Sequence, residues 1–129
     1  MHINIQLDFE IPKELISLYQ QASHDKFIGC ENPITDEEAE KHLTRYSLTR
    51  TYGRMERLGI LKIWLDNKLI GFSFPRVIQS TEYRGFKLEE TKLDWHRLGT
   101  IYIDEAVRGK GITSKVYELF KQDYPNLIW

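Results

Sequence analysis

A segment typical of a strand, a glycine-rich turn and an amphipathic helical segment follow one another between residues 98 and 120. Gly109 and Gly111 stand where the helix would begin, so the backbone there carries no side chain that could cover it. The first N–H groups of a helix have no partners within the helix, and the helix dipole makes that end positive. The pattern therefore predicts a cradle for phosphate, with Arg108 (in a bidentate manner) and Lys110 pairing with phosphate oxygens.

The common nucleotide-binding loops fit this turn poorly. A Walker loop has four residues between its glycines and a Lys-Ser/Thr pair after the second, and neither feature is present. A dinucleotide-binding fingerprint has a third glycine three residues after the second, where this chain has Ser114. The turn resembles the acyl-CoA loop of the GNAT superfamily of N-acetyltransferases, Gln/Arg-x-x-Gly-x-Gly/Ala, because residues 108–113 read Arg-Gly-Lys-Gly-Ile-Thr. Thr113 departs from that pattern at its last position.

The composition is that of an ordinary soluble globular protein. A chain of 129 residues fits one domain, here residues 1–129, and 41% hydrophobic with 29% charged residues is usual for such a domain. No apolar run approaches the ~20 residues of a membrane span. We therefore expect no membrane contact. The single cysteine, Cys30, excludes an internal disulfide, so we expect a reducing, cytoplasmic location.

Charge and metal-ligand content narrow the function classes further. A net charge of −1 and a pI near 6.4 argue against a dedicated nucleic-acid binder. Acids gather in residues 31–40 and bases in residues 41–62, which indicates two solvated surfaces or, alternatively, a basic rim near the CoA phosphates or an acidic partner. His24 precedes Cys30 without a further ligand or orienting partner, so neither a catalytic cysteine nor a metal site is predicted.

Hydrophobic periodicity predicts the element order β, α, α, β, β, β, α, β. Strands are expected near residues 2–9, 60–65, 69–74, 98–103 and 127–129, and helices after Pro12, after the capping box at residues 35–38 and after Gly111. Residues 47–59 are expected to be irregular or weakly helical, and residues 75–97 to hold the end of a long strand and a loop. The predicted class is α+β, a mixed central sheet flanked by helices. The order resembles the GNAT fold truncated after its fifth strand.

The resemblance implies a binding mode for acetyl-CoA. In GNAT enzymes the fourth and fifth strands splay apart, and the pantetheine arm pairs with the fourth strand as an added strand would. Carried onto this chain, the cofactor-binding residues are Ile101, Tyr102, Ile103, Arg108, Gly109, Lys110, Gly111, Ile112, Thr113 and Ser114. The implied reaction is the transfer of acetyl to an amine of a protein or small molecule, by direct attack of the amine on the thioester.

Such a reaction needs a group that accepts the proton of the amine. Many relatives place a glutamate near the start of the fourth strand, where this chain has Arg97, and arginine cannot act as a base at neutral pH. His96 is the predicted catalytic base, acting directly or through a water, with an ordinary surface histidine as the competing interpretation. Asp94, Glu90 or water alone are the alternatives. No proton donor for the thiolate is assigned.

Two further expectations concern activity and assembly. The alternative to acetyl transfer is a GNAT-like domain that only binds CoA or a partner, or that modifies a nucleic-acid base. A fifth strand at residues 127–129 would leave an unpaired, apolar edge, which is a hazard in a soluble monomer. We therefore expect a homodimer joined through the C-terminal edge, in which the contact could also complete the pocket for the amine.

Overall fold

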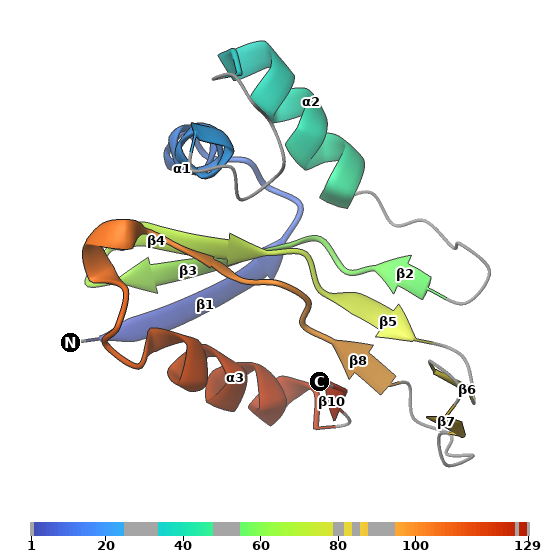
Figure 1. Cartoon of the computed structure of the whole chain (residues 1–129). Coiled ribbons are helices and arrows are strands. Elements are labelled where there is room, and N and C mark those ends of the chain that lie inside the picture. The colour runs from blue at the N-terminus through green and yellow to red at the C-terminus, as the bar shows by residue number, and fades with distance from the viewer. Residues whose placement is uncertain are drawn as a thin grey trace.

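The computed structural model describes residues 2–24, 34–47, 55–78, 82–83, 86–87, 95–125 and 127–128. Within these ranges helices cover both faces of a layer of strands (Figure 1). Helices α1 (Lys13–His24) and α2 (Asp36–Ser47) lie on one face, and α3 (Ile112–Asp123) lies on the other. This layering confirms the predicted α+β class. In the part of the chain that is described, no helix is long and apolar enough to cross a membrane.

The strands form two hydrogen-bonded sheets, and the chain passes back and forth between them. The first has the order β1 (Ile3–Asp8), β3 (Ile60–Leu65), β4 (Lys68–Ser73) and β9 (Tyr102–Ile103). The second has the order β10 (Leu127–Ile128), β8 (Trp95–Arg97), β5 (Arg76–Ile78) and β2 (Met55–Arg57). A separate small hairpin joins β6 (Glu82–Tyr83) and β7 (Phe86–Lys87). Among the described pairs only β8 and β10 run parallel, as expected after a crossover helix.

The prediction of one strand over residues 98–103 was wrong, because the strand begins earlier and is interrupted. β8 precedes the predicted start, residues 98–101 are irregular, and β9 resumes at Tyr102. Leu98, Ile101 and Ile103 all pack on the α3 side, so the alternation of faces shifts by one residue across the break. Gly99 absorbs the shift with φ +80°, a conformation that favours glycine.

A second prediction was wrong for residues 55–57, which form β2 instead of irregular or helical chain. β2 pairs antiparallel with β5, and this partner lies about twenty residues further on, at Arg76–Ile78. Pairing over such a distance leaves no short-range periodicity in a strand of three residues.

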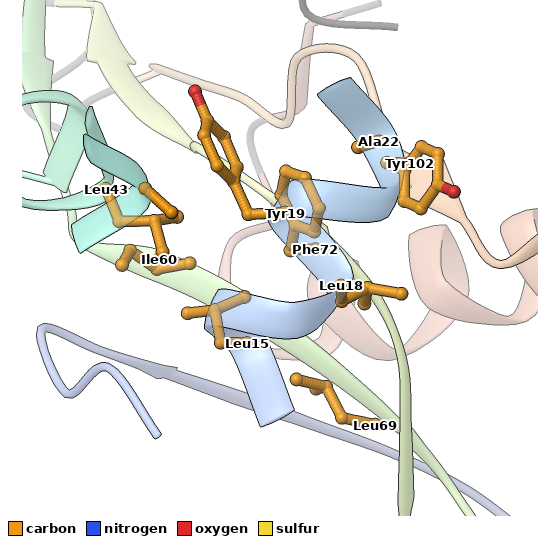
Figure 2. Packing of buried hydrophobic residues seen from close by; sticks show 10 residues of the cluster. Leu15, Leu18, Tyr19, Ala22, Leu43, Ile60, Leu69, Phe72 and Tyr102 are labelled. Carbon is orange, nitrogen blue, oxygen red and sulfur yellow. The ribbon is translucent and has the colours of Figure 1, made fainter. Parts of the chain in front are cut away.

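The core has one cluster on each face of the sheet. On the α1 side, Leu15, Leu18, Tyr19 and Ala22 are all buried, as their helical spacing predicted, and they pack with Phe72 and other strand residues (Figure 2). On the α3 side, Ile112, Val116 and Phe120 are buried against the opposite face. Burying each large apolar side chain contributes about 1.5–3 kcal/mol, so the two clusters hold the helices against the sheet.

Local geometry at β4 agrees with its sequence. The turn into β4 places Asp66 and Asn67 at φ +47° and +70°, as in a tight hairpin turn between β3 and β4. A Cβ added to Gly71 would lie 2.5 Å from the Tyr102 carbonyl oxygen, so β9 approaches β4 closely there. The register with β3 also shifts between Ile63 and Trp64, next to the pair of Ile63 and Gly71, which is the mark of a bulge. These features fix the position of β9 beside β4.

Candidate functional site

A cavity of about 530 Å³ opens between β9 and the start of α3. Its lining consists of Ile101, Tyr102, Ile103, Val107, Arg108, Gly109, Gly111, Ile112, Thr113 and Ser114. The structure thus brings together all the predicted cofactor-binding residues except Lys110, which is exposed and outside the lining. Val107 was not predicted, although an apolar residue directly before the motif that begins at Arg108 could have drawn attention to it.

The strand side of the cavity is an open backbone edge. Asp104 donates from its backbone N to the Ile70 carbonyl of β4 at 2.7 Å. Because successive residues of a strand point their N–H and C=O groups to opposite sides, those of Ile103 face away from β4, and its carbonyl accepts a hydrogen bond from Arg108 Nε. Among the described strands, none but β4 pairs with β9. An extended ligand with amide groups could therefore pair with this edge as an added strand.

The helix side of the cavity is a glycine-bounded helix start. Gly111 precedes α3 at φ +73°, and no side chain caps the helix there. The backbone N of Lys115 donates to the Gly111 carbonyl at 3.3 Å, so the N–H groups of residues 112–114 lie ahead of the helical ladder. The first turn also lacks an acidic residue. The positive end of the helix dipole is thus left to a ligand.

Glycine is favoured at positions 109 and 111 because of the backbone conformation there, and not because neighbouring atoms crowd these positions. A Cβ added at either position would meet no atom within 4 Å, so both sit in open surroundings. Their φ values of +80° and +73°, however, lie in the left-handed region that other residues rarely adopt. The residues present therefore fit a phosphate group, because the turn is bare and its backbone is already bent around the helix start.

Arg108 connects the two sides of the cavity. Its Nε donates to the Ile103 carbonyl at 2.8 Å, on the open side of β9. Its guanidinium carbon lies 5.3 Å from the centroid of the Tyr102 ring, a cation–π contact. The same group thus lies between the strand edge and the glycine turn, where an anion bound at the turn would meet it.

A side-chain network that the sequence did not reveal ties α1 to this loop. Gln21 donates from Nε2 to the Tyr102 hydroxyl and to Asp104 Oδ1, both at 3.0 Å. The same carboxylate oxygen accepts from the backbone N of Ala106 at 3.1 Å and so caps the short helix η1 (Glu105–Val107). Asp104 has the residue type of a helix cap, but nothing in the sequence indicates that Gln21 reaches it across 83 positions.

Comparison with known proteins finds similarity in structure alone. No protein-family model matches the chain, and no curated protein matches it in sequence. A V. cholerae integron cassette protein matches with a TM-score of 0.68 at 10% identity, over 100% of this chain and 75% of that one. A GNAT family acetyltransferase of Staphylococcus aureus matches at 0.58 and 16% identity, over 100% and 87%. A ribosomal-protein-alanine N-acetyltransferase of Brucella melitensis matches at 0.57 and 19% identity, over 98% and 78%.

The chain has the GNAT fold. In that fold β8 and β9 together form the fourth strand and β10 forms the fifth. β10 pairs with β8 through Leu127 and His96, whereas β9 has no described partner on that side.

Of the candidate catalytic bases, His96 alone lies within the described residues. His96 lies in β8 and is half-buried, and its ring packs on Tyr124 with centroids 4.5 Å apart. It does not belong to the cavity lining and stands before the break at residues 98–101, while the lining begins after it. Asp94 and Glu90 lie outside the described residues, as does Cys30. Within the described ranges, no group of three or more His, Cys, Asp or Glu could hold a metal ion.

Proposed function

We propose that this chain is an N-acetyltransferase that binds acetyl-CoA in the cavity between β9 and α3 and passes its acetyl group to an amine. One observation carries the proposal: a single cavity joins an open strand edge to an uncapped, glycine-bounded helix start. CoA has matching parts, an amide-bearing arm and a pyrophosphate. The structural similarity to acetyltransferases supports the same reaction class.

Each part of the cavity has a role in this proposal. The N–H of Ile103 and the backbone groups of Ile101 would bind and align the extended arm, since the Ile103 carbonyl already accepts from Arg108. The N–H groups of residues 112–114 and the guanidinium of Arg108 would hold the pyrophosphate. Acetyl-CoA would supply the acyl thioester that the amine attacks. Most of the rate gain then comes from holding the two reactants in one orientation.

The proton acceptor is proposed to be His96, with Asp94, Glu90 or water as the alternatives. His96 lies on the same strand as the cavity lining, a few residues upstream. Histidine is the side chain most often used for proton transfer near neutral pH. The group that receives the acetyl is proposed to be an amine of a small molecule or protein. Similar structures include both a ribosomal-protein-alanine and an aminoglycoside acetyltransferase, so this fold serves both kinds of acceptor.

Calorimetry with acetyl-CoA tests the proposal directly. Wild-type protein should bind acetyl-CoA and CoA, and Gly111→Asp should abolish binding, because it adds a carboxylate to the helix start and a side chain at φ +73°. Lys110→Ala is the matched control, since Lys110 lies outside the lining and its loss should weaken binding only slightly. Absence of binding by the wild type at millimolar ligand would contradict the proposal.

The alternative, a domain that binds without transferring acetyl, predicts a different pattern. Thermal shifts with acetyl-CoA, CoA and an oligonucleotide should show stabilisation by the first two ligands only, if the acetyltransferase proposal is correct. Release of CoA in the presence of a panel of amines then separates an enzyme from a binding module. Stabilisation by the oligonucleotide alone would favour a role on nucleic acid.

A further inference from the structure

Among the described strands, β1 lies at the edge of its sheet, and its one hydrogen-bonded neighbour is β3. Its six residues, Ile-Asn-Ile-Gln-Leu-Asp, include no proline, lysine or arginine, and their pairing with β3 is unbroken by a bulge. Proteins normally protect edges of this length with such devices, because a free edge pairs readily with another strand.

The backbone groups at this edge have a known direction. The backbone N of Asp66 donates to the His2 carbonyl at 3.0 Å, so the N–H and C=O groups of even-numbered β1 residues face β3. Those of Ile3, Ile5 and Leu7 consequently face outward. Every second residue of β1 therefore offers a donor and an acceptor to a further strand.

The side chains of β1 sort by face. Ile3, Ile5 and Leu7 pack against the α3-side cluster but stay partly exposed along the edge. Asn4 and Gln6 are exposed on the opposite face. Just beyond the strand, Phe9 is 51% exposed, and no other large apolar side chain of the described residues is exposed. The edge thus has an apolar side and an amide side.

These features fit one partner better than any other, a second copy of β1. An antiparallel pair centred on Ile5 sets Ile5 opposite Ile5 of the other copy. Ile3 then faces Leu7, Asn4 faces Gln6, and His2 faces Asp8. Aliphatic meets aliphatic, amide meets amide, and a histidine meets a carboxylate at both ends. The outward groups of the three odd-numbered residues also meet each other, which the hydrogen-bond ladder requires.

We propose that two copies of this chain associate through β1, antiparallel with Ile5 at the two-fold axis, to form one continuous sheet. The axis is perpendicular to the sheet, so both copies of α3 lie on one face of the dimer and both α1–α2 pairs on the other (Figure 1). A slip by one residue would set the apolar side against the amide side, and a slip by two would lose the pairing of Asn4 with Gln6 and of His2 with Asp8. This dimer differs from the one expected at the C-terminal edge, and the cavity at β9 stays open because β3 and β4 lie between β9 and β1.

Light scattering coupled to size exclusion tests the association. Over a dilution series the wild type should pass from one copy, 15.4 kDa, to twice that mass as concentration rises. Ile5→Pro removes an N–H that faces outward and leaves the ladder to β3 intact, so it should give a monomer with an unchanged circular dichroism spectrum. A wild type that stays monomeric at every concentration would overturn the proposal. So would an Ile5→Pro variant that folds and still dimerises, because the contact would then lie elsewhere.

A pair of double variants tests the register itself. Asn4→Lys with Gln6→Lys sets like charges opposite each other across the axis and should give a monomer. Asn4→Glu with Gln6→Lys sets opposite charges there and should keep the dimer. Both share the change at Gln6, which accepts a hydrogen bond from Trp64, so any local cost is matched. Equal masses for the two variants would overturn the proposed register.

Discussion

At the scale of single residues, the most constrained charge is Lys62, whose side chain is buried on the α1 side of the sheet. Its Nζ donates to Asp8 Oδ1 at 2.5 Å and to the carbonyls of Glu10 and Ile60 at 3.1 and 3.3 Å. Burial by itself would raise the pKa of Asp8. Hydrogen bonds from Lys62, from the Glu10 backbone N and from Gln6 outweigh it and hold that pKa below its ordinary value. The ion pair of Asp8 and Lys62 joins β1 to β3.

The two partners should respond unequally to removal. Asp8→Asn leaves the ammonium of Lys62 buried without a counter-charge, so we expect a loss of about 3–5 kcal/mol of unfolding free energy. Lys62→Met leaves Asp8, whose side chain is 33% exposed, able to reach water, so its loss should be smaller. Urea denaturation of both variants measures the difference. An equal or reversed order would mean that the buried charge is not the dominant cost.

The same pair gives a direction for pH dependence. A carboxyl whose folded pKa is lowered contributes stability above its unfolded pKa. This stability is lost as the pH falls through the folded value. The wild type should therefore lose more stability on acidification than Asp8→Asn, which has no proton to take up at that site.

His96 provides the catalytic prediction at this scale. If it accepts the proton of the amine, His96→Ala should lower kcat about a hundredfold or more and leave the affinity for acetyl-CoA unchanged. Because its ring packs on Tyr124, loss of that packing is a competing cause. Tyr124→Leu removes the packing and keeps the imidazole, so it should retain most of kcat. Near-normal turnover in His96→Ala would move the role to Asp94, Glu90 or water.

At the scale of elements, the link from α1 to the cavity loop makes Gln21 a positioning residue. Gln21→Ala loses the hydrogen bonds to Tyr102 and Asp104, each with a net contribution of about 1 kcal/mol, so KM for acetyl-CoA should rise by up to about thirtyfold with kcat little changed. Gln20→Ala is a matched control. It loses bonds from the preceding α1 residue to Ile34 and Asp36, at 3.1 and 2.7 Å, which lie toward α2. A rise in KM in both variants would indicate general loosening of α1.

The elements also show how far sequence patterns reach. The helices were predictable because the spacing of residues such as Leu15, Ala22 and Val116 is local and repeats with the helical turn. The glycine turn was predictable because only glycine accepts the φ of Gly109 and Gly111 without strain. The break after Leu98 was not, because it depends on contacts with β4. Ser73 Oγ donates to the Leu98 carbonyl there at 2.7 Å, and that partner is 25 positions away.

At the scale of the whole molecule, the cavity lies where the sheet is least connected. Within the described strands, β9 is hydrogen-bonded to β4 alone. Helix α3 packs against the sheet through the cluster that contains Ile112, Val116 and Phe120. A ligand that pairs with β9 and the start of α3 would tie these two parts together. Binding should therefore stabilise the fold as a unit and most strongly protect the backbone of residues 101–114.

Thermal unfolding and hydrogen exchange test this whole-molecule effect. At a hundred times its Kd, acetyl-CoA should add about 2.7 kcal/mol, which raises Tm by roughly 10 °C for a domain of this size. Binding should slow hydrogen exchange more at β9, η1 and the start of α3 than in α2, which does not border the cavity. Gly111→Asp should show neither change, because its helix start repels phosphate. A shift in Tm with uniform protection, or with protection centred on α2, would place the ligand elsewhere.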